Sequence, residues 1–153
     1  YLKALKMKIL LMRMKTMIRT YEELSKCQTF IQRFNYLKLG DKVGKETFGY
    51  DRYINQRFYK TPEWKKLRDE IIIRDDGCDL GHPDFPIYGR IIIHHMNPLT
   101  KDDIIHSSEY LLDPKYLVCV SHDTHNAIHY GNSDLLLVEE PVIRKPNDTC
   151  PWR

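Results

Sequence analysis

The most constraining feature of the chain is an apolar run that ends in two adjacent histidines. Residues 91–98 read IIIHHMNP, and the isoleucines favour a β-strand over 88–95 that stops before a turn at Asn97. Neighbouring residues on a strand point to opposite faces, so His94 and His95 cannot do the same job. Either one ring is buried and the other is solvated, or each ring has a separate role at a site.

The segment downstream supplies a second strand and a helix that carries more histidines. KYLVCVS at 115–121 has the composition of a strand, with Leu117 and Cys119 on one face, and a polar, irregular connection with one helical turn is expected before it. DTHNAIHY at 123–130 indicates a helix that Asp123 caps. The central segment is therefore predicted to run strand, long loop, strand, helix.

The spacing of the histidines favours a metal site. His125 and His129 are four residues apart, so a helix places both imidazoles on one face, within reach of a single ion. His94 or His95 can supply a third nitrogen, and three protein ligands leave the open positions that a catalytic ion needs. The other strand-end ring would lie beside the ion, where it could accept a proton from water. Taken alone, each of the two patterns more often reflects ordinary surface or packed histidines than a metal site. Their combination in the order strand, loop, strand, helix is much more specific for a metal site.

Helices are also expected in the N-terminal half. Residues 20–39 begin with Thr20 and two acidic residues, a good N-terminal signal, and predict one or two short helices. Thr61 then caps a helix over 62–74, with Trp64 on its apolar stripe. Glycines and prolines between this helix and the first strand predict a loop.

Charge and composition separate the first residues from the rest. The first 20 residues carry six of the 24 basic residues and no acidic residue, so 21–153 hold 18 basic and 21 acidic residues, a net charge of −3. Overall charge therefore gives no support for nucleic-acid binding, which has to be argued locally. Basic residues interrupt the apolar ones in 1–16, unlike a signal peptide. We interpret 1–16 as a leader or non-native extension ahead of Met17, rather than as a basic amphipathic helix.

The cysteines and the hydropathy argue against two further classes of protein. Cys27, Cys78, Cys119 and Cys150 are far apart and form no C-x-x-C pair, which suits reduced thiols in a cytosol better than a disulfide framework. The chain has no uninterrupted apolar run of about 18 residues, so no membrane association is expected. These features favour a cytoplasmic protein.

The histidine segments resemble a known enzyme family. GRIIIHHMNPLT and DPKYLVCVSHDTHNAIHYG are similar to the motif of HNH endonucleases, the ββα-metal (His-Me finger) nucleases. A wider match, from RTYEELSK to PNDTCPWR, is similar to bacteriophage and prophage HNH proteins and covers nearly everything after Met17. The resemblance implies an α+β fold with a ββα-metal core, N-terminal helices packed around it and an irregular C-terminal tail. The expected organisation is a single domain over 17–153, made of a helical part (20–75), the ββα-metal core (about 88–131) and the tail (132–153).

The resemblance also implies a role for each histidine. His94 matches a metal ligand, and His125 and His129 match the two metal ligands of the motif helix. His95 matches the general base that activates the attacking water. Tyr116 stands where the family usually has an asparagine or histidine that orients the base, and we retain it as a catalytic candidate because its hydroxyl can donate or accept a hydrogen bond.

One divalent ion is the expected cofactor. Many HNH proteins hold a structural zinc ion with two C-x-x-C pairs, but the corresponding positions here are Cys78, Gly81, Ser121 and Thr124, so no structural zinc is expected. Three imidazoles favour nickel, zinc, cobalt or manganese over magnesium, which prefers oxygen ligands. Because affinity and activity need not rank alike, Mg²⁺, Mn²⁺, Ni²⁺ and Zn²⁺ all stay candidates.

The segment expected to bind DNA is 52–74, where basic and aromatic residues are interleaved. Phosphate contacts from lysine and arginine would position a duplex without reading its sequence. The plainer interpretation is a solvated helix face, and the sequence favours neither. The candidate DNA-binding residues are Arg57, Lys60, Lys65, Lys66, Arg68 and Arg74.

Together these inferences predict a metal-dependent DNA endonuclease that hydrolyses phosphodiester bonds with a histidine base and a single divalent ion. The resemblance implies a phage protein that acts on double-stranded DNA in the cytoplasm of a bacterial host, with phage terminase subunits as partners by analogy alone. Two alternatives stay open: a ββα module that binds metal and nucleic acid without catalysis, and a small zinc-stabilised interaction domain. Retention of His95 argues against both, because a structural site needs only the other three histidines.

Overall fold

The computed structural model describes residues 17–39 and 56–136 and has a mixed α+β architecture. Its sheet has two antiparallel strands, β1 (Ile92–His95) and β2 (Leu117–Val120). The predicted strand over 88–95 is confirmed in its second half, whereas its first residues are not part of the sheet.

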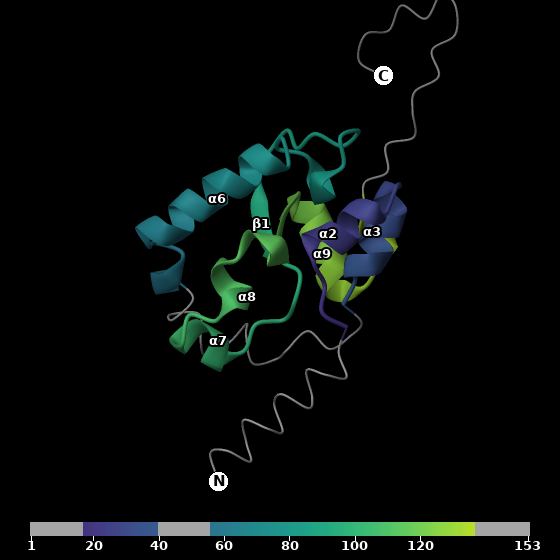
Figure 1. Cartoon of the computed structure of the whole chain (residues 1–153). Helices are drawn as coiled ribbons and strands as arrows, with labels where there is room; N and C mark the ends of the chain where they lie inside the picture. The colour runs from purple at the N-terminus through teal and green to yellow at the C-terminus, as the bar shows by residue number, and fades with distance from the viewer. Residues whose placement is uncertain (1–16, 40–55, 137–153) are drawn as a thin grey trace, which may run out of the picture.

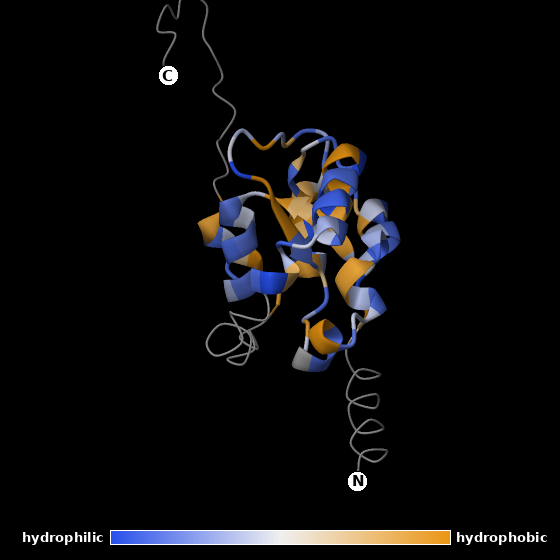
Figure 2. Ribbon diagram, turned by 90° about the vertical axis from the view of Figure 1, so that its left-hand side faces the viewer, coloured by the Kyte–Doolittle hydropathy of each residue, from blue (hydrophilic) through white to orange (hydrophobic). Residues whose placement is uncertain are grey.

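The sheet lies between two groups of helices (Figure 1). Helix α6 (Pro62–Arg74) covers one face. The other face is covered by α2 (Tyr21–Lys26), α3 (Phe30–Leu37) and α9 (His122–Tyr130). Figure 2 shows an apolar strand, drawn in orange, at the centre of the molecule, with helices of mixed blue and orange around it.

The alternation of side chains along the strands divides the core in two. Val118 and Val120 pack on the α9 side, whereas Leu117 and Cys119 pack on the α6 side, which confirms that Leu117 and Cys119 share one face. The first cluster also contains Leu24, Phe30, Phe34, Leu37, Leu80, Met96, Ala127, Ile128 and Leu136. The second also contains Trp64, Leu67, Ile71 and Ile93. Each cluster thereby fixes one helical layer against the short sheet.

The helix starts follow the capping rules, with one correction. The hydroxyls of Thr20 and Thr61 accept hydrogen bonds from backbone N–H groups in the first turns of α2 and α6, which confirms both predicted caps. The predicted cap of α9, Asp123, is wrong. Ser121 is the N-cap and accepts from the N–H of Thr124 at 3.1 Å, because the extended backbone of β2 continues to that residue.

The connection between the strands is more ordered than the sequence indicated. It contains α7 (Lys101–Ile105), α8 (Glu109–Leu112) and a 3₁₀ turn, η2 (Pro114–Tyr116), in place of a single helical turn. Thr100 and Asp103 form a capping box that starts α7. The short α8 matters for the site because it carries a backbone carbonyl to the end of β1.

A buried carboxylate ties the loop after α6 to the start of α9. Asp79, in the 3₁₀ turn η1 (Asp79–Gly81), accepts hydrogen bonds from the Ser121 N–H at 3.2 Å and from the Thr124 hydroxyl at 2.6 Å. Gly81 closes this turn at φ 60°, where an added Cβ would lie 2.9 Å from the Tyr21 hydroxyl. The two loops are thus joined by hydrogen bonds among protein groups.

The described part of the predicted tail contains one further turn, η3 (Ser133–Leu135). The predicted leader at 1–16 and the rest of the tail, 137–153, lie outside the described residues. Within 17–39 and 56–136, no helix has the length and apolar character needed to cross a membrane.

Candidate metal centre

Three imidazole rings from β1 and α9 meet on one side of the sheet. His94, His125 and His129 each offer a ligand nitrogen, and these nitrogens lie within 4.8 Å of one another. The ring centroid of His94 is 5.4 Å from that of His125 and 5.2 Å from that of His129. The structure therefore brings together the residues for which the sequence predicted metal binding, and we call them the histidine trio.

The local structure explains why the rings converge. His94 points toward α9 because it shares a face of the sheet with Val118, its partner in the register. On α9, the buried Thr124, Ala127 and Ile128 hold the helix against the core. The spacing of four then turns His125 and His129 toward the same side as His94.

The two helical rings are spaced as a shared ion requires. The Nε2 atoms of His125 and His129 are 3.1 Å apart. Two nitrogens bound to one tetrahedral ion at about 2.0–2.1 Å would lie about 3.3 Å from each other. The same separation suits a hydrogen bond in which one ring donates its proton to the other, and an ion would replace that proton.

The Nε2 atom of His94 is buried and has no hydrogen-bond partner among the described residues. A polar nitrogen left this way costs about 1–3 kcal/mol of stability, which a bound cation would relieve. Burial lowers the pKa of His94 well below its usual value, and the neighbouring His125 and His129 lower it further. Burial also lowers the pKa of His125 to about 4 and reduces that of His129. The rings are thus neutral near pH 7, the state that binds a metal ion.

His95 lies at the same end of β1 but points to the α6 side. Its Nε2 is 3.1 Å from the backbone carbonyl oxygen of Leu111. A carbonyl oxygen can only accept, so Nε2 carries the proton and Nδ1 of the neutral ring carries the lone pair. Burial lowers the pKa of His95 to about 4, so this form dominates at neutral pH. The ring can therefore accept a proton at Nδ1.

The indole of Trp64 stacks on the imidazole of His95. The ring centroids of Trp64 and His95 are 5.5 Å apart and their planes differ by 17°. Phe58 and Tyr59 pack edgewise or tilted against the same indole. The sequence predicted that Trp64 would be buried, but it gave no sign of this partner or of the Leu111 carbonyl.

Tyr116 takes part in the fold through its ring and its backbone. The ring is buried beside Tyr110, with centroids 4.6 Å apart, and the Lys115 ammonium lies 4.7 Å from the ring centroid. Its carbonyl accepts from the Met96 N–H at 2.9 Å. Within the described residues its hydroxyl makes no hydrogen bond to the backbone beside His95, so its catalytic role stays a prediction.

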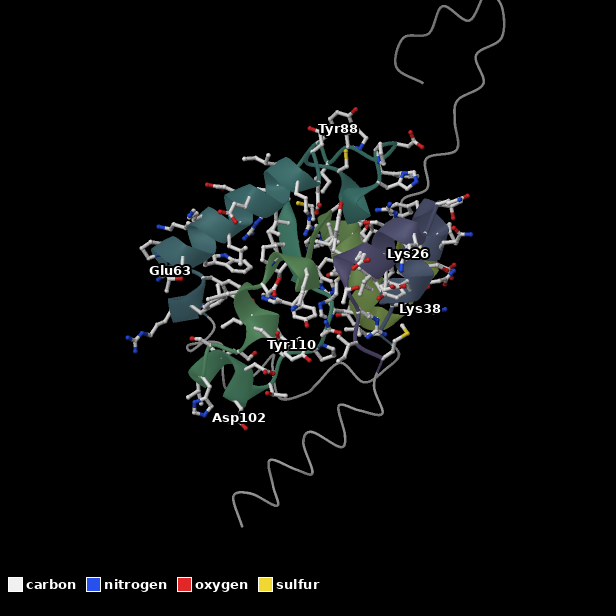
Figure 3. The ribbon with its side chains drawn as sticks, in the orientation of Figure 1. Lys26, Lys38, Glu63, Tyr88, Asp102 and Tyr110 are labelled. Atoms are coloured by element: carbon white, nitrogen blue, oxygen red, sulfur yellow. The ribbon has the colours of Figure 1, made fainter. Side chains whose placement is uncertain are left out.

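The predicted DNA-binding residues fall into two groups. Arg57, Lys60, Lys65 and Lys66 are exposed near the start of α6, and we call them the basic cluster. Acidic side chains share this helix, and Figure 3 shows Glu63 on its outer side. Arg68 is half-buried and donates to the Ile91 carbonyl at 3.3 Å.

Arg74 is bonded to other parts of the fold. Its guanidinium donates to the Asp75 carboxylate and to the carbonyls of Pro114 and Leu117 at 2.7 Å. It also lies 3.5 Å from the centroid of the Tyr21 ring. These contacts leave it joined to the fold rather than presented to a phosphate.

No protein-family model, curated protein or solved structure matches the chain. The function must therefore be argued from the geometry of the histidine trio, His95 and the basic cluster.

Proposed function

We propose that the chain is a metal-dependent DNA endonuclease of the HNH type, in which β1, β2 and α9 form the ββα-metal core. The observation that carries this proposal is the convergence of the histidine trio beside a fourth ring, His95, whose hydrogen bond to Leu111 selects the proton-accepting tautomer. A structural metal site would have no use for the fourth ring in this state.

The histidine trio fits a single divalent ion. It offers three neutral imidazoles, one of which has a buried Nε2 without a hydrogen-bond partner in the described part of the chain, and it leaves further coordination positions for oxygen ligands. When bound, such an ion would act as a Lewis acid on a phosphate oxygen and on the leaving 3′ oxygen. Three imidazoles suit Mn²⁺, Ni²⁺ and Zn²⁺, and Mg²⁺ remains a candidate because affinity and activity need not rank alike.

His95 is the proposed general base. A water molecule would transfer a proton to Nδ1 while the hydroxide attacks phosphorus and the bond to the 3′ oxygen breaks. The Nε2–H group keeps its bond to the Leu111 carbonyl throughout, which holds the ring in place and stabilises the imidazolium that forms. Trp64 restricts rotation of the ring from its other side.

The proposed substrate is double-stranded DNA, bound by its phosphates. The basic cluster lies around the start of α6, on both sides of Trp64 in the sequence, and Trp64 packs directly on the proposed base. Exposed lysine and arginine side chains at this position would attract the duplex without sequence preference. A phage origin and a terminase partner rest on the resemblance of the motif alone.

The placement of Tyr116 favours one alternative, a module that binds metal and nucleic acid without cutting. Its ring packs against Tyr110 in a tilted arrangement, so the side chain at this position does not take the place of the residue that usually orients the base. In our proposal the Leu111 carbonyl and Trp64 orient His95 instead.

Plasmid nicking by the wild type and the His95→Ala variant, each with its metal content measured, tests the proposal. We expect the wild type to nick with at least one of the four ions, and the variant to keep its metal and lose activity by a factor of at least about 100. His106→Ala, which removes an exposed imidazole at the end of α7, is the control and should cut normally. A wild type that binds metal and DNA but never cuts would favour the binding module.

A further inference from the structure

Arg19 lies beside the strand end that carries His94 and His95. Its backbone N–H donates to the side-chain oxygen of Asn97 at 2.8 Å, and its carbonyl accepts from the Asn97 amide at 2.8 Å. Asn97 follows β1 by two residues. This reciprocal pair fixes Arg19, two residues before α2, to the end of the strand.

The side chain of Arg19 extends to the C-terminal end of α3. Its Nε donates to the Tyr36 carbonyl at 2.9 Å, and one Nη2 hydrogen points to the Lys38 carbonyl at 3.4 Å. The next residue, Leu39, donates to the carbonyl of Ile128 on α9 at 3.0 Å. Arg19 therefore connects two parts of the site. Its backbone is bonded to the end of β1, which supplies His94, and its side chain is bonded to the end of α3. That end of α3 is bonded in turn to α9, which supplies His125 and His129 (Figure 3 labels Lys38).

The guanidinium of Arg19 has spare binding capacity. Its Nη1 makes no hydrogen bond, and no carboxylate pairs with it, among the residues that the structure describes. It is half-buried, and desolvation lowers its pKa from the usual value. Asn97, to which the Arg19 backbone bonds, is three residues beyond His94, and the positive charge of Arg19 makes a further, smaller contribution to the lowered pKa of His94. A partly desolvated cation without an anionic partner interacts strongly with an anion that approaches it.

We propose that Arg19 contacts a nonbridging oxygen of the DNA phosphate through Nη1, at the edge of the histidine trio. The inference rests on the proposed function, because it assigns to that function a substrate contact outside the HNH motif. In a purely structural role, Arg19 would only bond the carbonyls at the end of α3. That role explains the hydrogen bonds of Nε and Nη2, but it gives no function to the N–H groups of Nη1. The planar guanidinium allows both tasks at once, since its donors point in fixed and different directions.

The test compares Arg19→Gln and Arg19→Lys with the wild type and with Lys38→Gln. The control removes an exposed cation at the same end of α3 whose backbone carbonyl, not its ammonium, meets Arg19. Three quantities are measured on each full-length protein: affinity for a short DNA duplex in EDTA as a function of salt, metal affinity, and kcat and KM for nicking.

We expect Arg19→Gln to bind the duplex about 3–10 times more weakly, with a salt slope about one unit smaller, while its metal affinity is unchanged. Its kcat should fall about 10–100-fold, and Arg19→Lys should recover part of both losses because it restores the charge but not the fork. Lys38→Gln should change kcat by less than about twofold. Wild-type duplex affinity and kcat in Arg19→Gln would overturn the inference, as would a kcat loss that only follows lost metal or a lower Tm.

The two proposals can fail separately. If the wild type binds metal but nicks with none of the four ions, the nuclease assignment fails, and the duplex affinities alone decide the role of Arg19. Weaker binding by Arg19→Gln would then still support a phosphate contact, whereas unchanged binding would remove it.

Discussion

The indole of Trp64 stacks on the imidazole of His95, with centroids 5.5 Å apart and planes inclined by 17°. The two residues come from different layers, α6 and β1, and the contact joins the second core cluster to the proposed base. Together with the Leu111 carbonyl, it leaves the ring one orientation and one tautomer. Helix α6, which was predicted to bury Trp64 and to carry DNA-binding residues, therefore also contacts the proposed base.

Replacement of Trp64 should affect cutting more than metal binding. In Trp64→Leu the His95 ring can rotate, so we expect kcat for nicking to fall about tenfold, roughly 1.4 kcal/mol in the barrier. Trp64→Phe keeps an aromatic face and should stay within about threefold of the wild type. Steady-state nicking and metal titration on both variants check this. A folded Trp64→Leu protein with full metal content and wild-type kcat would show that the stacking does not position the base.

The basic cluster should contribute to DNA affinity without affecting stability. Lys65 and Lys66 are exposed, and the latter lies 3.9 Å from Glu70 in a surface ion pair that contributes little. We expect Lys65→Gln/Lys66→Gln to lower the salt slope of duplex binding by about two, one for each lost phosphate contact, and to shift Tm very little. Fluorescence anisotropy over a salt series measures this, with Lys26→Gln on α2 as the control. Equal slopes in the double variant and the wild type would mean that these lysines are only a solvated face.

The Asp79–Thr124 hydrogen bond should stabilise the fold in a pH-dependent way. Burial raises the pKa of Asp79, and the hydrogen bond from Thr124 opposes that shift because it favours the ionised carboxylate. Thr124→Val should therefore lower the free energy of unfolding by about 1–3 kcal/mol at pH 7. The loss should shrink as the pH falls through the pKa of Asp79, which lies above its usual value of 3.8.

Urea unfolding at pH 7 and near pH 4 tests this bond, with Thr124→Ser as the matched control because it keeps the hydroxyl. A loss in Thr124→Val that equals the loss in Thr124→Ser, or that does not change with pH, would contradict the assigned role.

The predictable parts of the structure are those that depend on local spacing. The alternation of β2 and the i, i+4 spacing of His125 and His129 determine which side chains share a face, and both appear in the structure as expected. The caps at Thr20 and Thr61 were equally local. Ser121 and Asp123 are both good capping residues, and the choice between them depends on where the strand ends, which composition does not encode.

Other features depend on contacts between distant segments. The Leu111 carbonyl meets His95 only because α7 and α8 fold back toward β1, and a backbone oxygen leaves no mark in the sequence. Arg19 was counted only as one of the six basic residues in the first 20 positions, although it bonds to Asn97. Arg74 could have been recognised as structural, since it follows the buried Leu67 by seven residues and lies on the same stripe of α6.

The central claim, that three imidazoles share one cation, is tested most directly by calorimetric titration of the metal-free protein with Zn²⁺, for the wild type, His125→Ala and His122→Ala. The last variant removes an exposed ring from the same helix and serves as the control. We predict one ion per chain for the wild type and the control, and an affinity at least about 100-fold weaker for His125→Ala, because two imidazoles hold zinc far less tightly than three. Equal affinity in all three proteins, or no binding by the wild type, would contradict the account.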